Sequence, residues 1–158
     1  TEQILNGDPI TITNPEMTRF LMSLQDSVDL VIHAFKSMKN GDIFVQKSPA
    51  STINDLALAI MEIFNKKSDI KIIGTRHGEK LYETLLGKEE KAKAEDQGNF
   101  FRVPADSRDL NYDEFFEKGE LDTEEFDEYN SHNTKRLTVD EVISILEKLP
   151  YIKAKLNA

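Results

Sequence analysis

Three stretches of the chain place apolar residues at helical spacing directly after a helix-start signal. Each stretch opens with Ser or Thr, followed three residues later by Asp or Glu. In this capping box the side chains satisfy backbone N–H groups that the first helical turn leaves without partners. The pattern therefore predicts three helices, which begin after Ser23, Thr52 and Thr138. We expect the last of them to span 138–149 and to end at Pro150.

Short apolar runs bounded by turn residues alternate with the predicted helices, and each has the length of a strand. These runs cover 10–13, 43–46, 70–73 and 100–103. An alternation of strands and helices favours an α/β fold. Two other segments are less regular. Thr1–Gly7 has the pattern of a helix end that stops at Asn-Gly, and 88–97 has helix-forming residues without an apolar face, so any helix there is exposed.

The 158-residue chain has a net charge of −9, and its acidic excess lies in one segment. Residues 106–130 contain 11 acidic and 2 basic side chains, whereas the rest of the chain carries 18 of each sign. We expect a solvated loop there, and we divide the chain into an α/β region at 1–105 and a C-terminal extension at 106–158. A chain with this charge repels phosphate backbones, so no nucleic-acid partner is expected.

Composition narrows the chemistry further. The chain has no cysteine, and its histidines, His33, His77 and His132, are too far apart in sequence to share one turn of helix. No metal site is therefore expected. We expect His33 to be packed in the core or at its rim, and His77 to face solvent or to form a hydrogen bond. No apolar run approaches the ~20 residues that cross a bilayer, so no membrane insertion is expected. We also expect a cytoplasmic location.

The sequence contains no pattern for a cofactor. None of its seven glycines forms G-x-G-x-x-G or G-x-x-x-x-G-K-[ST], which place a glycine-rich loop and a helix start around phosphates. Tyr151 and Lys155 have a spacing, Tyr-x-x-x-Lys, that can support hydride chemistry. They lie close to the end of the sequence, where we expect fraying, and we interpret the spacing as a coincidence. We therefore expect neither a cofactor nor a catalytic residue in this chain.

The segment Gly74–Lys80 follows a predicted strand and carries charged side chains between two glycines. At such a strand end the backbone can approach a ligand. The planar guanidinium of Arg76 suits a diphosphate, and Glu79 could accept hydrogen bonds from two neighbouring hydroxyls, as on a ribose. The alternative is an exposed turn in which Arg76 and Glu79 form an ion pair of little consequence.

Arg19 is a second candidate, since it lies between the apolar residues Met17 and Phe20 just before a helix start. In such surroundings an arginine is either partly buried against a carboxylate or directed at a ligand. The local sequence leaves both interpretations open.

Several motifs in fixed order resemble a known family. They are MTRFLMS at 17–23, GDIFVQK at 41–47, GTRHGEK at 74–80, RDLNY at 108–112 and YNSHNT at 129–134. They are similar to the C-terminal half of bacterial nucleotide-sugar dehydratases and epimerases of the extended short-chain dehydrogenase/reductase superfamily. The similarity is strongest to the capsular-polysaccharide branch, whose members are described as UDP-N-acetylglucosamine 4,6-dehydratase (5-inverting) or UDP-glucose 4-epimerase.

The resemblance implies a role for each candidate residue. Arginines in the places of Arg19 and Arg76 hold the UDP diphosphate, and an acidic residue in the place of Glu79 holds the uridine ribose. The strand around Ile10 and Ile12 contacts the uracil, largely through its backbone.

The same resemblance implies that NAD(P) and the catalytic groups belong to an N-terminal half that precedes Thr1. The chain is then expected to lack most of the Rossmann half, to bind a UDP-sugar and to be inactive alone. Apolar surface left open by the missing half predicts a homo-oligomer, with segments exchanged between copies as one form of it. Two alternatives stay open: a non-enzymatic nucleotide-sugar-binding module, and an interaction domain that acts through the acidic segment at 106–130.

Overall fold

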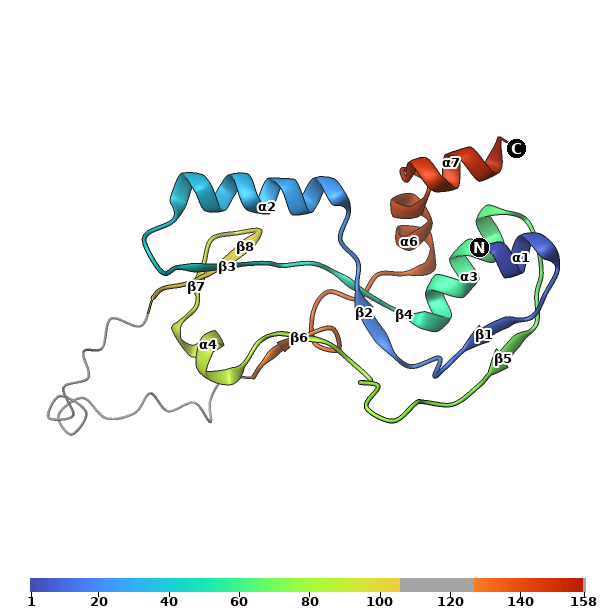
Figure 1. Ribbon diagram of the computed structural model, residues 1–158, viewed down its shortest axis with the longest axis horizontal. Coiled ribbons are helices and arrows are strands. Elements are labelled where there is room, and N and C mark those ends of the chain that lie inside the picture. Colours follow the sequence, from blue (N-terminus) through green and yellow to red (C-terminus); the bar gives the residue numbers. More distant parts are fainter. Residues whose placement is uncertain (106–126, 158) are drawn as a thin grey trace, which may run out of the picture. The chain divides into compact units, whose positions relative to one another are not determined.

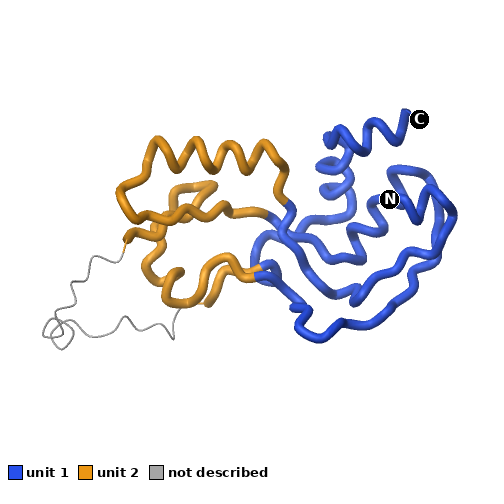
Figure 2. Tube along the Cα trace, in the orientation of Figure 1, with its two compact units in different colours: residues 1–21, 49–83, 131–158 blue, residues 22–48, 84–130 orange. Residues whose placement is uncertain are grey.

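The computed structural model describes residues 1–105 and 127–157 (Figure 1). Most of the acidic segment, 106–126, lies outside them, so the expected loop and the division of the chain at residue 105 remain predictions. Two compact units interleave along the sequence (Figure 2). Unit 1 comprises Thr1–Leu21, Pro49–Glu83 and Ser131–Ala158, and unit 2 comprises Met22–Ser48 and Thr84–Asn130.

Unit 1 contains a parallel pair of strands, β1 (Ile10–Ile12) and β5 (Ile70–Ile72). They pack against α3 (Ile53–Ile63) and the short helix α1 (Glu2–Asn6), which stops at a left-handed glycine as the sequence predicts. The buried side chains of this core are Ile4, Ile10, Ile12 and Ala57. Because parallel strands end at the same edge of a sheet, the loops that follow β1 and β5 leave from one edge.

A second pair in unit 1 is antiparallel and joins β2 (Thr18–Phe20) to β4 (Ala50–Thr52). A segment from far along the chain lies beside β4: the N–H of Ala50 donates to the carbonyl of Lys135 at 2.9 Å, and that of Leu137 donates to the carbonyl of Ala50 at 2.8 Å. The segment is thus held in register next to β4.

That segment leads into α6 (Val139–Leu146), which packs on α3 as Figure 1 shows. Ala59, Leu137 and Val142 form the buried core between them. The helix begins at Thr138, whose hydroxyl accepts from the N–H of Glu141, so the predicted capping box is confirmed.

The predicted end of this helix is wrong. It stops at Leu146, and Pro150 opens a further helix, α7 (Pro150–Leu156), instead of only closing the preceding one. Proline fits the first helical position because no helical partner exists there for the N–H it lacks. The expected fraying is wrong as well, since Ile152 is buried and the Tyr151 hydroxyl donates to Glu2 at 2.6 Å.

Unit 2 is a three-stranded antiparallel sheet in the order β3 (Ile43–Gln46), β8 (Phe100–Val103) and β7 (Glu95–Asp96). It also contains α4 (Lys88–Lys93) and the paired strands β6 (Thr84–Leu86) and β9 (Tyr129–Asn130). Its buried core residues are Leu86, Phe101 and Val103. Strands and helices alternate along the chain, and the predicted α/β class is confirmed.

The long helix α2 (Leu24–Ser37) of unit 2 is amphipathic, and one of its faces is half-buried. His33 stacks on Phe100 with ring centroids 4.3 Å apart and pairs with Gln97 at 2.9 Å, at the rim of the core as expected. The opposite face is open. We call it the α2 stripe, and its residues, between 43% and 83% exposed, are Leu24, Val28, Val31, Ile32 and Phe35.

Neither unit contains, in its described residues, a helix long and apolar enough to cross a membrane.

Candidate functional site

The loop after β5 carries two of the predicted site residues in unit 1. Gly74 and Gly78 have φ values of 80° and 82°, which a glycine adopts without strain. Arg76 lies between these glycines, and Glu79 directly follows Gly78. The Glu79 carboxylate accepts a hydrogen bond from the backbone N–H of Arg76 at 3.1 Å and from the Thr13 hydroxyl at 3.3 Å. Thr13 directly follows β1, so Glu79 joins the loop to the shared end of the parallel strands.

Arg76 is exposed, and its guanidinium makes no polar contact with any described residue. The ion pair considered from the sequence is absent from this part of the chain, because the Glu79 carboxylate binds the Arg76 backbone and not its side chain. The His77 side chain is exposed, as expected. The Arg76 guanidinium is thus open to a ligand from solvent.

Arg19, on β2, lies against the same loop. Its Nη2 donates to the carbonyl oxygen of Lys80 at 3.0 Å, and its Nη1 donates to that of Thr18 at 2.7 Å. The Glu83 carboxylate is 3.7 Å from its Nε, and the side chain is 29% exposed. Arg19 is thus half-buried near a carboxylate, and it adjoins the loop that carries the other candidates. Its contact with a ligand stays a prediction.

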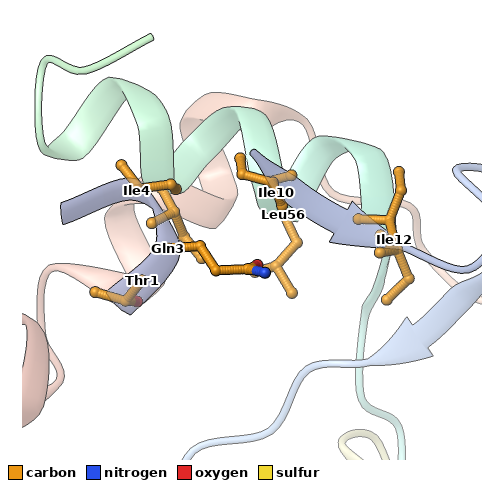
Figure 3. A pocket seen from close by; sticks show the side chains of 9 residues that line it. Thr1, Gln3, Ile4, Ile10, Ile12 and Leu56 are labelled. Atoms are coloured by element: carbon orange, nitrogen blue, oxygen red, sulfur yellow. The ribbon is translucent and has the colours of Figure 1, made fainter. Parts of the chain in front are cut away.

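The Ile10 and Ile12 side chains point into the core and line an apolar pocket of about 130 Å³ in unit 1 (Figure 3). Any ligand contact from β1 must therefore use its backbone or the exposed side chain of Thr11, which bonds to Gln3 at 3.1 Å. The uracil contact stays a prediction.

A buried polar cluster lies beside Arg19 and was not predicted from the sequence. The Thr18 and Ser131 hydroxyls, both fully buried, lie 2.8 Å apart, and His132 Nδ1 is 2.7 Å from the Thr18 hydroxyl. The His132 ring also contacts Tyr82. The only sequence signal was the YNSHNT motif at 129–134, which carried a resemblance but no role.

The described residues do not fit the NAD(P) that the resemblance implies. The glycine-containing loop after β5 leads to a strand, β6, and not to a helix whose N-terminus could receive a pyrophosphate. Tyr151 and Lys155 both bind the carboxylate of Glu2, which raises the pKa of each. A tyrosine that acts as a general base must lose its proton near neutral pH, and a raised pKa opposes that loss. We derive no step through the cofactor from these residues.

Comparison with known proteins defines the class of the chain. The family described as "Polysaccharide biosynthesis protein" matches residues 1–105, and "Polysaccharide biosynthesis protein C-terminal" matches residues 106–153. The chain is thus an α/β protein of the extended short-chain dehydrogenase/reductase type, as its motifs indicate. It belongs to the polysaccharide biosynthesis protein family, and its second part matches that family's C-terminal region.

Individual relatives agree with this assignment. Proteins named UDP-glucose 4-epimerase from Rickettsia felis and Rickettsia bellii (strain OSU 85-389) are 56% and 57% identical over 155 residues. These matches cover 98% of this chain and 46% of each relative, so the chain spans about half their length. The X-ray structure of Pen from Bacillus thuringiensis is similar with a TM-score of 0.72 at 28% identity, over 94% of this chain and 42% of that one.

Proposed function

We propose that the chain is the UDP-sugar-binding, C-terminal part of a nucleotide-sugar 4,6-dehydratase or epimerase that serves surface-polysaccharide biosynthesis. The observation that carries the proposal is the contact of Arg19 with the loop that bears Arg76 and Glu79. Glu79 in turn meets Thr13 at the carboxyl ends of β1 and β5, the kind of edge where open α/β sheets bind ligands.

Each candidate residue has capacity left for a ligand. The planar fork of Arg76 can donate two parallel hydrogen bonds to a diphosphate. A carboxylate has about four acceptor positions, and Glu79 uses one on each oxygen, for Thr13 and for the Arg76 N–H. The remaining positions suit the two neighbouring hydroxyls of a ribose. Arg19 adds positive charge at the same loop.

In this proposal the chain binds the UDP group of the substrate. The binding energy of that group holds the reacting sugar in position. The catalytic groups lie outside this chain in our proposal, and NAD(P) bound there would supply hydride transfer. The substrate we propose is UDP-N-acetylglucosamine, for 5-inverting 4,6-dehydration. The names of the relatives support the alternative, 4-epimerisation of UDP-glucose. For either reaction we propose a cytoplasmic location.

Calorimetry with UDP tests the proposal. We expect the 158-residue chain to bind UDP without added cofactor. Arg76→Ala should weaken binding about tenfold or more, as the loss of a charge-assisted hydrogen bond would. Lys71→Ala removes an exposed positive charge from β5 and is the matched control, with little expected effect. A wild-type chain that binds no UDP, or equal losses in the two variants, would contradict the proposal.

A non-enzymatic nucleotide-sugar-binding module is the second candidate. It is favoured by the position of Arg19, Arg76 and Glu79 within one unit whose described residues form no cofactor loop. Assay of the longer gene product with NAD(P) and either UDP-sugar separates the two, because only an enzyme converts the sugar. The interaction-domain alternative depends on the acidic segment 106–130, of which residues 106–126 lie outside the described part of the chain.

We also propose that the α2 stripe is covered by a second copy when this chain is alone. Its apolar side chains form one continuous face along about three turns of helix. The relatives are about twice as long, so the remainder of such a protein could cover this face in the longer form. A chain without that remainder has a copy of itself as the partner at hand.

A further inference from the structure

One buried hydroxyl joins the two segments that hold Arg19. Ser131 Oγ donates to the carbonyl of Thr18 at 3.1 Å and accepts from the N–H of Glu83 at 3.0 Å. The Ser131 N–H also donates to the carbonyl of Glu83 at 2.9 Å. Thr18 directly precedes Arg19, and Glu83 closes the stretch that contains Lys80, an acceptor for Arg19. Ser131 therefore fixes the spacing between the strand that carries the guanidinium and the loop that receives it.

Short polar contacts extend this link to a histidine. Ser131 Oγ lies 3.1 Å from the Thr18 carbonyl oxygen and 2.8 Å from the Thr18 hydroxyl, and that hydroxyl lies 2.7 Å from Nδ1 of His132. A chain of hydrogen bonds thus joins His132, Thr18 and Ser131 to the carbonyl that also accepts from Arg19.

The two hydroxyls of this chain of hydrogen bonds are buried, so the loss of their hydrogen bonds has a cost. Thr18 and Ser131 are both 0% exposed, and a buried polar group left without its partner cannot turn to water. Further along the same segment, the backbone of 135–137 is hydrogen-bonded to Ala50 on β4. The residues from Ser131 onward are therefore held between β2, β4 and the end of the loop.

We propose that Thr18, Ser131 and His132 are positioning residues through which the segment that begins at Ser131 orients Arg19 for the diphosphate of a nucleotide. The proposal rests on the function proposed above. The carbonyl oxygens of Thr18 and Lys80 orient the Arg19 guanidinium. Ser131 holds together the segment that contains Thr18 and the segment that contains Lys80. It thus has a role although no ligand contact is predicted for it.

The test measures the affinity of the whole 158-residue chain for UDP and for uridine by calorimetry. Thr18→Val keeps the shape of the side chain and removes its hydroxyl, whereas Thr18→Ser keeps the hydroxyl. We expect Thr18→Val to weaken UDP binding about tenfold, a factor equivalent to one hydrogen bond, and to leave uridine binding unchanged. Thr18→Ser should restore most of the UDP affinity. In an Arg19→Ala background, Thr18→Val should have no further effect.

Several outcomes would overturn the inference. Equal losses for UDP and uridine, or an equal loss with and without Arg19, would mean that Thr18 only stabilises the fold. If Thr18→Val does not fold, His132→Phe is tested in its place. A phenyl ring at this exposed position can keep the contact with Tyr82 but lacks Nδ1. Unchanged UDP affinity in His132→Phe would also refute the proposal. Binding that responds to Arg76→Ala but not to Thr18→Val refutes this inference alone. A wild-type chain that binds no UDP refutes the proposed function as well.

Discussion

The carboxylate of Asp42 lies across the guanidinium of Arg102, accepting from Nε at 2.7 Å and from Nη2 at 3.1 Å. The two side chains are 2% and 11% exposed. A third hydrogen bond runs from Nη1 of Arg102 to the more exposed Glu95 at 2.7 Å. The pair joins the turn before β3 to the middle of β8, and the hydrogen bonds from Arg102 lower the pKa of Asp42 to about 2.

This pair predicts how the stability of unit 2 depends on pH. The pKa of Asp42 is lower in the folded chain than its ordinary value of 3.8, so the pair stabilises the fold above about pH 4 and this contribution is lost as the pH falls toward 2. We expect Asp42→Asn to lower the melting temperature most above pH 4 and progressively less between pH 4 and 2. Circular dichroism melts measure the difference. Asp29→Asn, at an exposed position on α2, is the control, and a difference constant over this range would contradict the prediction.

The N-terminal cap of α2 provides a second prediction. Ser23 Oγ accepts from the N–H of Asp26 at 3.1 Å, and the Asp26 carboxylate accepts from the N–H of Ser23 at 2.8 Å. Ser23→Ala should lower the free energy of unfolding by about 1 kcal/mol, the typical value of such a cap. Urea unfolding measures it. Ser23→Thr keeps the acceptor and should recover most of the loss, whereas an equal loss in both variants would argue against capping as the cause.

The three capped helices were predictable because their signals are local. Ser23, Thr52 and Thr138 each lie three residues before their carboxylate partner, and the hydroxyl of each accepts from that partner's N–H. The parallel strands β1 and β5 also emerged from their apolar runs. The short strands β2, β4, β6, β7 and β9 did not, since none of them is an apolar run bounded by turn residues.

The candidate site divides in the same way. Arg76 and Glu79 are three residues apart in a glycine-flanked segment, so the sequence could propose them together. Nothing local connects Arg19 with Lys80, because that contact depends on where β2 lies relative to a loop 61 residues further on. Ser131 is 113 residues from Thr18, and only the folded chain brings their hydroxyls together.

The final helix, α7, supplies a third prediction. Ile152 is 3% exposed, although the sequence indicated a fraying end. Ile152→Ala should lower the free energy of unfolding by about 2 kcal/mol, the lower end of the range for such a truncation, because a terminal helix can shift to fill the space. Leu156→Ala, in the same helix at 47% exposure, should change it by less than about 0.5 kcal/mol. Similar effects of the two variants in urea unfolding would mean that α7 is not packed in solution.

The α2 stripe predicts the association state of the chain. Phe35, 76% exposed, lies near the end of the stripe. Phe35→Glu places a charge where two copies would meet, so we expect the wild-type chain to sediment as an oligomer and the variant to shift toward monomer. Gln25→Glu adds the same charge on the polar side of α2 and should leave the oligomer intact. If sedimentation velocity shows that the wild-type chain is monomeric at high micromolar concentration, association through the α2 stripe is ruled out.

The interleaved path of the chain limits how this family can vary in evolution. Unit 1 takes residues 1–21 from the start of the sequence and residues from Ser131 onward from its end, so neither matched region is a module that genes could shuffle independently. Recombination between homologous genes near residue 105 would pair a Thr18 from one parent with a Ser131 from the other. Only parents whose sequences are compatible on both sides of that crossover would yield a folded hybrid.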